Sequence, residues 1–287
     1  MNTDMTGRVC LITGANSGIG KETALALAKM DATLILVCRD AVKGKAVIQE
    51  IEATSGNKKL NLMLADMSSV QSIRALAKQI LEKYPKVHVL VNNAGSVFSE
   101  RLTSKDGFEM TFALNHLGYF LLTQLLLDRI KESAPSRIVS VASEAQQAGR
   151  INFEDLQSEK SFSGFTAYGT SKLMNVLFTY ELDRRLNRSG SSGVTANAMH
   201  PGGVATNFAA NTSGLFTFFW KLITPFLLTP AQGAETVIYL ASSPEVEGIS
   251  GKYFIKKKPA RSVAVSYDEA VAKRLWEVSE KLTGDQI

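Results

Sequence analysis

The chain has 287 residues, of which 45% are hydrophobic and 21% are charged, and its formal net charge is +5. This composition excludes a disordered or fibrous protein, and the length suits one α/β domain with a sizeable core. The mild positive charge favours an anionic cofactor or membrane surface, but it is too small to indicate nucleic acid as a partner. The densest basic run, at 256–258, lacks interleaved aromatic residues and predicts a solvated face.

Short apolar runs alternate with segments of helical period, which is typical of βαβ units. The pattern predicts a single domain, residues 1–287, with a Rossmann-type doubly wound parallel sheet of about seven strands and helices on both faces. The predicted strands are 8–13, 33–38, 60–64, 87–91, 137–142, 194–199 and 252–255. The predicted helices are 18–29, 41–55, 68–82, 108–131, 165–187, 231–241 and 268–282.

The first strand runs into TGANSGIGKETALALA, where Gly14, Gly18 and Gly20 crowd the turn into a helix. Glycine lets backbone approach a ligand closely, and a helix N-terminus offers unpaired N–H groups to a pyrophosphate. The spacing is G-x-x-x-G-x-G rather than the common G-x-G-x-x-G, so a tight strand-to-helix turn is the alternative. A preceding strand, a following helix and a matching second strand favour a dinucleotide site.

The second strand ends in LILVCRD. An NAD site usually carries an acidic residue there, but Cys38 stands in that place and Arg39 follows it. A guanidinium can bind a 2′-phosphate through two hydrogen bonds, so the strand end predicts NADP(H). The alternative is an ordinary surface arginine.

Polar residues end the later strands or interrupt the helices near them. Asn92, Asn93 and the Ala94–Gly95 turn close the fourth strand, and Ser143 ends the fifth. Asn115 lies inside the predicted helix 108–131, where an amide side chain has no propensity reason to be. Because ligands of such sheets bind beyond the carboxyl ends of the strands, these groups are expected at one edge.

The helix 165–187 contains YGTSK, in which Tyr168 and Lys172 are four residues apart. They therefore share one helix face. A fixed cation favours phenolate, so Lys172, together with a cationic nicotinamide, is expected to lower the pKa of Tyr168 and make it a usable proton donor or acceptor. Such a pair also arises by chance, and its companions at the sheet edge give it weight.

The segment 203–230 interrupts the alternation, and its part LFTFFWKLITPFLL is aromatic and aliphatic. An apolar substrate lid is the leading interpretation, with membrane contact, a partner surface and core packing as alternatives. His88, His116 and His200 have no metal-ligand spacing, so we expect no metal site and structural roles for the three rings. Two cysteines in apolar runs and no signal peptide indicate a cytoplasmic protein, with peripheral membrane contact as an option.

The segments TGANSGIG, NNAG, the Asn115 region, Ser143, YGTSK and HPGGVATN together resemble the short-chain dehydrogenase/reductase family over nearly the whole chain. GKETA, the CRD strand end and INFEDLQSEK, among others, resemble its retinol dehydrogenase branch. That resemblance implies an NADP(H)-dependent enzyme that interconverts a retinal-like or other hydrophobic carbonyl and its alcohol. A general carbonyl reductase for small substrates is the enzymatic alternative, and a non-catalytic NADP-sensing protein is a further one.

The resemblance also implies catalytic roles. Tyr168 would exchange the proton with the carbonyl oxygen, and Ser143 would hydrogen-bond that oxygen. Lys172 would hold the nicotinamide ribose, and Asn115 would position a water that links Lys172 to solvent. The helices 108–131 and 165–187 resemble those that form homodimer interfaces in this family.

For the cofactor, the resemblance implies that Asp66 and Met67 contact the adenine, that 93–95 line the adenine and ribose, and that 201–206 lie on the nicotinamide side. The implied cofactor-binding residues are Gly14, Asn16, Ser17, Gly18, Ile19, Gly20, Arg39, Asp66, Met67, Asn93, Ala94, Gly95, Tyr168, Lys172, Pro201, Gly202, Val204 and Thr206.

Overall fold

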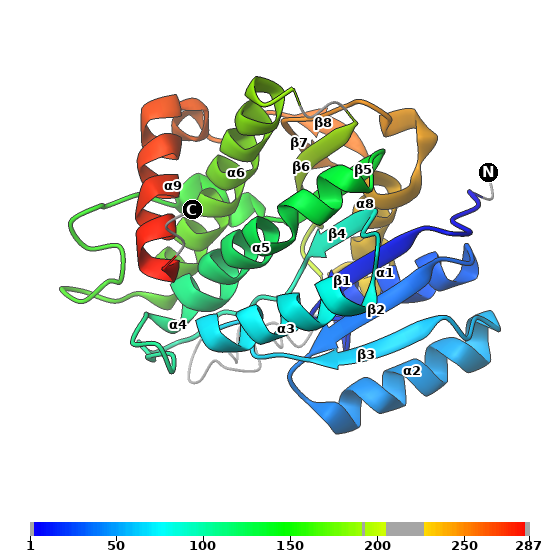
Figure 1. Cartoon of the computed structure of the whole chain (residues 1–287). Helices are drawn as coiled ribbons and strands as arrows, with labels where there is room; N and C mark the ends of the chain where they lie inside the picture. Colours follow the sequence, from blue (N-terminus) through cyan, green and yellow to red (C-terminus); the bar gives the residue numbers. More distant parts are fainter. Residues whose placement is uncertain (1–2, 191–192, 205–226, 285–287) are drawn as a thin grey trace.

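The computed structural model describes residues 3–190, 193–204 and 227–284, and within them eight strands form one sheet (Figure 1). The strand order is β3-β2-β1-β4-β5-β6-β7-β8. The first seven strands pair in parallel, so the predicted doubly wound parallel sheet is confirmed. The strands are β1 Val9–Thr13, β2 Thr33–Cys38, β3 Leu60–Leu64, β4 Val89–Asn92, β5 Ser136–Val141, β6 Val194–His200, β7 Lys252–Ile255 and β8 Lys258–Ala260.

The eighth strand is an addition to the seven expected from the sequence. It pairs antiparallel with β7 through a two-residue turn, in which Lys256 and Lys257 both have positive φ angles of 49° and 64°. Glycine or asparagine normally occupies such a hairpin turn. Because two lysines stand here instead, the sequence did not predict the hairpin or the strand that follows it. Pro259 is compatible with the position because β8 is the edge strand.

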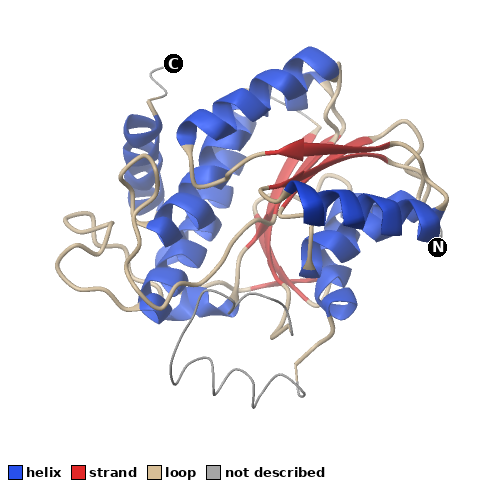
Figure 2. Cartoon of the chain, turned by 90° about the horizontal axis from the view of Figure 1, so that it is seen from below, coloured by secondary structure: helices blue, strands red, loops and turns tan. Residues whose placement is uncertain are grey.

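Helices cover both faces of the sheet, as Figure 2 shows from below. One apolar cluster joins α1, α2 and α8 to one face, and another joins α3, α5, α6 and α9 to the opposite face. The longer helices are α1 Gly18–Lys29, α2 Ala41–Ser55, α3 Val70–Lys83, α5 Gly118–Glu132, α6 Gly164–Arg188, α8 Pro230–Ser242 and α9 Glu269–Thr283. These bounds lie within two residues of the predicted ones, except between 108 and 118.

The predicted helix over 108–131 is present as one helical run, Met110–Glu132, but the prediction missed a change of helix type inside it. A single turn, α4 Met110–Phe112, leads into a π-helical turn at Ala113–Leu117, and α5 follows. The Glu109 carboxylate caps the start by accepting from the backbone N–H groups of Thr111 and Phe112. Asn115, one of the predicted catalytic residues, lies inside this π-turn. Such turns are frequent at functional sites.

Among the described residues, one helical run, Met110–Glu132, is long and apolar enough to cross a membrane by composition alone. However, 72% of its apolar window is buried inside the protein. Phe120, Leu122 and Leu126 of this run belong to the apolar cluster that α3, α5, α6 and α9 form on one face of the sheet. Their burial accounts for the apolar composition, which is therefore weak evidence for a membrane span.

Helix α9 packs against α5 and α6. The indole of Trp276 lies 5.0 Å from the ring centroid of Phe120 and 5.8 Å from that of Phe178. The guanidinium of Arg185 lies 4.2 Å from the Trp276 ring. Part of the surface that α5 and α6 could offer to a second copy is thus covered by the chain itself, and the homodimer stays a prediction.

The two ends of the predicted lid segment meet beside β6. Val204 and Leu228 form an isolated bridge, and the N–H of Leu228 donates to the carbonyl of Gly203 at 2.8 Å. Residues 205–226, which include Thr206 and most of the apolar stretch, lie outside the described residues. The lid interpretation stays a prediction.

Candidate active site

The turn between β1 and α1 is built on glycines that no other residue could replace without strain. Gly14 and Gly18 have φ angles of 66° and 54°. A Cβ on Gly14 would lie 2.9 Å from the Cα of Ala94, and a Cβ on Gly20 would collide with the carbonyl oxygen of Gly14. The loop therefore turns tightly and brings α1 close to β1 and β4, as the sequence predicted.

The N-terminus of α1 lacks the side-chain cap that α2 and α3 carry. Its N-cap, Ser17, makes no side-chain capping hydrogen bond, and its first turn carries no acidic residue. The N-caps Asp40 of α2 and Ser69 of α3, by contrast, accept hydrogen bonds from their first turns. The first N–H groups of α1 are therefore left for another acceptor, and a phosphate suits them in charge and geometry.

At the end of β2, Arg39 is exposed and Asp40 is engaged elsewhere. The Asp40 carboxylate accepts hydrogen bonds from the N–H groups of Val42 and Lys43 at 2.9 and 3.0 Å. That use leaves Arg39 as the charged group directly beyond the strand. Selection of a 2′-phosphate by Arg39 stays a prediction.

Asp66 and Met67 follow β3 close to this arginine. Burial acts to raise the pKa of the Asp66 carboxyl, but hydrogen bonds from Ser68 and the positive charge of Arg39 outweigh it and hold the pKa below its ordinary value. Ser68 donates through both its N–H and its hydroxyl, at 3.0 and 2.6 Å. Met67 is buried in the core, so its backbone is the part that can contact a ligand.

The end of β4 is tied to the phosphate loop. The N–H groups of Asn93 and Ala94 donate to the hydroxyl of Thr13 at 2.9 and 3.0 Å. The Asn93 amide donates back to the carbonyl of Thr13 at 2.8 Å. These bonds hold Asn93 and Ala94 against β1, and the role of 93–95 as a wall for adenine and ribose stays a prediction.

Asn115 is fully buried, and both its amide hydrogens and its amide oxygen form hydrogen bonds. Its Nδ2 donates to the Ser96 carbonyl and to Ser171 Oγ, both at 3.0 Å, and its Oδ1 accepts from the Ser96 N–H at 3.0 Å. The π-turn aims this side chain at α6 and at the strand end. The Asn115 side chain therefore fastens three segments, a role that its sequence position could not reveal.

Lys172 is 4% exposed, and its Nζ donates to the carbonyl of Val141 at 2.9 Å. The same Nζ lies 5.5 Å from the ring centroid of Tyr168. Burial lowers the pKa of Lys172 to about 7. A Cβ on Gly95 would lie 3.5 Å from this Nζ and 3.1 Å from Asn115 Oδ1, so these groups meet at one point.

Tyr168 and Ser143 also meet at this edge. Burial raises the pKa of Tyr168 well above its ordinary value, and a hydrogen bond with the Ser143 hydroxyl opposes the rise. The protein groups alone therefore do not give the lowered tyrosine pKa that the sequence suggested. The reason is that burial destabilises the phenolate, and the hydrogen bond with Ser143 offsets only part of that effect.

One residue of this cluster escaped the sequence reasoning. Tyr119 is fully buried, its ring centroid lies 5.7 Å from Lys172 Nζ, and its hydroxyl has no hydrogen-bond partner among the described residues. It is four residues after Asn115, so helical spacing was the signal that could have found it.

On the opposite wall, Gly202 has a φ of 89° and Val204 is buried. A Cβ on Gly233 would come within 2.5 Å of Val204 and 3.4 Å of Ile19. The absence of a side chain at Gly233 thus lets α8 pack against both Val204 and Ile19, at the start of α1. The predicted place of Pro201, Gly202 and Val204 on the nicotinamide side stays a prediction, and Thr206 lies outside the described residues.

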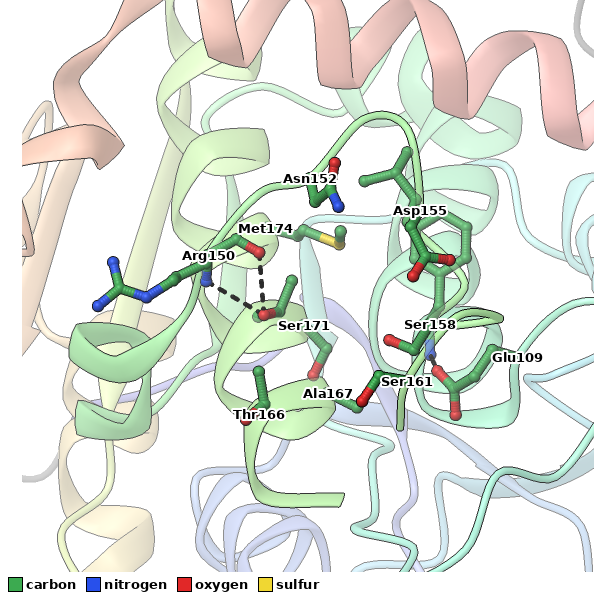
Figure 3. A pocket seen from close by; sticks show the side chains of 13 residues that line it. Glu109, Arg150, Asn152, Asp155, Ser158, Ser161, Thr166, Ala167, Ser171 and Met174 are labelled. Carbon is green, nitrogen blue, oxygen red and sulfur yellow. Dashed lines mark hydrogen bonds between the residues drawn. The ribbon is translucent and has the colours of Figure 1, made fainter. Parts of the chain in front are cut away.

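A separate cavity of about 270 Å³ lies between the loop 150–161 and the first turns of α6 (Figure 3). It is lined by Thr166, Thr170 and Ser171 but not by Tyr168 or Lys172. The Thr170 hydroxyl closes one side by bonding the N–H and the carbonyl of Arg150, both at 3.1 Å. This cavity is therefore behind the reaction centre rather than part of it.

Comparison with known proteins agrees with this geometry. The family model of short chain dehydrogenases matches residues 8–214. Human retinol dehydrogenase 11 is 46% identical over 98% of this chain and 87% of its own, and mouse retinol dehydrogenase 12 is 44% identical over 99% of this chain and 89% of its own.

Solved structures share the fold. An uncharacterised protein from Mycobacterium paratuberculosis has a TM-score of 0.80 and 33% identity, covering 98% of this chain and 95% of its own. The NADP complex of Pseudomonas aeruginosa RhlG has a TM-score of 0.69 and 26% identity, covering 88% of this chain and 95% of its own. The chain therefore belongs to the short-chain dehydrogenase/reductase family, as a retinol dehydrogenase-like oxidoreductase that acts on CH–OH groups.

Proposed function

We propose that the protein is an NADP(H)-dependent oxidoreductase that interconverts a hydrophobic, retinal-like aldehyde or ketone and its alcohol. The observation that carries the proposal is the meeting of Ser143, Tyr168 and Lys172 at the carboxyl edge of the sheet, next to the glycine turn of α1. A hydroxyl pair beside a buried amine suits proton exchange with a carbonyl oxygen. The phosphate loop suits a dinucleotide.

The residues present fit a nicotinamide dinucleotide. The uncapped start of α1 suits the pyrophosphate, and the wall at 93–95 and the turn after β6 flank the same edge. When bound, the dihydronicotinamide supplies the hydride. The residues proposed to hold the cofactor are those predicted from the sequence between Gly14 and Thr206, and relatives complexed with NADP make this phosphorylated form the better choice.

In the reduction, Ser143 and Tyr168 would orient the carbonyl oxygen through their hydroxyl groups. Because the pKa of Tyr168 is raised, the phenol keeps its proton at neutral pH and can donate it. Lys172 lies beside Tyr168 and is placed to hold a ribose hydroxyl, while Asn115 fixes the turn that faces it. The proposed role of Asn115 is to position a water that links Lys172 to solvent, for which its Oδ1 keeps one lone pair besides the bond from Ser96.

The test is consumption of NADPH with a carbonyl panel of all-trans-retinal, medium-chain aldehydes and aromatic ketones, with products identified. Alcohol formation from retinal is expected, because relatives named retinol dehydrogenases cover nearly the whole chain. Good turnover of small ketones without retinal would favour the general carbonyl reductase. NADPH binding without oxidation by any carbonyl would contradict the proposed activity.

Cofactor preference rests on Arg39, which is exposed at the end of β2. Replacing Arg39 with alanine is expected to weaken NADPH binding about tenfold or more while NADH affinity changes little, because only NADPH carries the 2′-phosphate. Fluorescence titration of both cofactors measures the ratio. Lys43→Ala on the neighbouring helix start is the matched control for loss of a nearby charge, and an unchanged NADPH/NADH ratio in Arg39→Ala would refute the assignment.

A further inference from the structure

A histidine and a glutamate join the end of β6 to the turn that carries Ser143. His200, the last residue of β6, is 7% exposed. Its Nδ1 accepts a hydrogen bond from the backbone N–H of Glu144 at 3.1 Å, and its Nε2 lies 3.1 Å from the Glu144 carboxylate. Because Nδ1 is an acceptor, the ring hydrogen belongs on Nε2, where it donates to the carboxylate.

The backbone bond acts next to the reaction centre. The Glu144 N–H belongs to the same planar peptide unit as the carbonyl of Ser143. Ser143 is also the N-cap of the short 3-10 turn Glu144–Ala148, and its Oγ accepts from the Ala145 N–H at 3.2 Å. Holding the Glu144 N–H therefore fixes the peptide plane from which the Ser143 side chain extends toward Tyr168.

His200 also precedes Pro201, which begins the wall opposite the phosphate loop. One buried ring is thus bonded to the Ser143 turn and covalently continuous with the segment proposed to flank the nicotinamide. A displacement of this ring would move Ser143 relative to Tyr168. Small displacements of reacting groups can cost up to about a hundredfold in rate.

We propose that His200 is a positioning residue for the reaction, and that it holds the Ser143 hydroxyl against Tyr168 by accepting the Glu144 N–H at Nδ1. The inference rests on the proposed function, because that function assigns Ser143 and Tyr168 to the carbonyl oxygen. It goes beyond the sequence interpretation, which gave the three histidines structural roles alone.

Two substitutions separate the two ring nitrogens. His200→Asn keeps an acceptor oxygen near the Nδ1 position and loses the reach to the carboxylate. His200→Gln reaches the Nε2 position and loses the acceptor near the ring root. We expect kcat to fall about tenfold or more in His200→Gln and to stay within about threefold of wild type in His200→Asn. NADPH affinity, measured by fluorescence titration, is expected to change less than kcat in both.

The chain holds a matched control at the other edge of the sheet. His88 is also 7% exposed, and its Nδ1 accepts from the backbone N–H of Val9 at 2.9 Å. His88→Gln breaks the same kind of bond at the amino ends of β1 and β4. It is expected to lower the melting temperature as much as His200→Gln does, with kcat unchanged.

The measurements use NADPH and the carbonyl that the wild type reduces fastest in the panel above, on protein whose folded state is checked by circular dichroism. Equal kcat in His200→Gln and wild type, or equal losses in the Asn and Gln variants, would overturn the positioning role alone. A wild type without turnover on any carbonyl would instead overturn the proposed function, and this inference with it.

Discussion

Turnover is expected to fall at least about a hundredfold when Tyr168 is replaced by phenylalanine, while NADPH affinity stays nearly unchanged. The substitution removes one oxygen from a helix whose other contacts remain. The phenol is the proton donor of the proposed reduction, and its raised pKa keeps it protonated at neutral pH. Without it, the developing alkoxide keeps the hydrogen bond from Ser143 but loses its proton donor. Steady-state kinetics and cofactor titration on the same preparation measure the two effects.

Tyr180→Phe is the matched control for loss of a phenol from α6. The Tyr180 hydroxyl lies 2.8 Å from Ser262 Oγ, three turns farther along the helix. Its loss is expected to cost about 1 kcal/mol of stability and to leave kcat unchanged. Turnover near the wild-type value in Tyr168→Phe would remove Tyr168 from the proton transfer, whatever the control shows.

Local patterns were sufficient where local forces decide the structure. The apolar runs predicted the parallel strands because the inner strands β1, β2, β4, β5 and β6 are buried on both faces. The residue types at Gly14, Gly18 and Gly20 predicted a close backbone turn. Tyr168 and Lys172 were placed on one face because helix geometry fixes that relation. The conformation at these positions depends on residues that are close in the sequence.

The failures have a common physical origin in long-range contacts. The π-turn at Asn115 is accompanied by bonds to Ser96 and Ser171, which are 19 and 56 residues away in sequence. The hairpin of β8 uses two lysines at positive φ, which no turn signal marks. Such positions gain their conformation from the packed structure rather than from their own propensity.

The same origin explains why the tyrosine pKa of the cofactor-free chain differs from the value expected with a bound nicotinamide. A lysine four residues from a tyrosine suggests a lowered tyrosine pKa, since the sequence shows the charge but not the solvent. In the folded protein both groups are withdrawn from water, so the pKa of Tyr168 rises and that of Lys172 falls. The sign of the tyrosine shift was therefore decided by burial, which depends on β5, α5 and α6 together.

Replacing Lys172 with methionine is expected to lower turnover at least about a hundredfold. The same substitution is expected to stabilise the cofactor-free protein by roughly 2 kcal/mol near pH 7. The methionine keeps most of the volume of the lysine stem and removes the group that is costly to bury. The lost hydrogen bond to the Val141 carbonyl, worth about 1 kcal/mol, offsets part of the gain. Activity and stability would thus move in opposite directions at one residue.

The pH dependence of this gain has a defined sign. The pKa of Lys172 is about 7 in the folded chain and near 10.5 when it is exposed, so between these values the unfolded chain binds the proton that the folded chain has lost. Wild-type stability relative to Lys172→Met therefore rises as the pH rises through this window, and it is lowest below pH 7.

Denaturant unfolding at pH 6.5 and 9.5 measures the difference in unfolding free energy between the two proteins. The substitution Lys78→Met, at an exposed position, is the control. A methionine variant that is less stable than the wild type at pH 6.5, or equally more stable at both pH values, would show that Lys172 is not held in the folded protein against a desolvation cost.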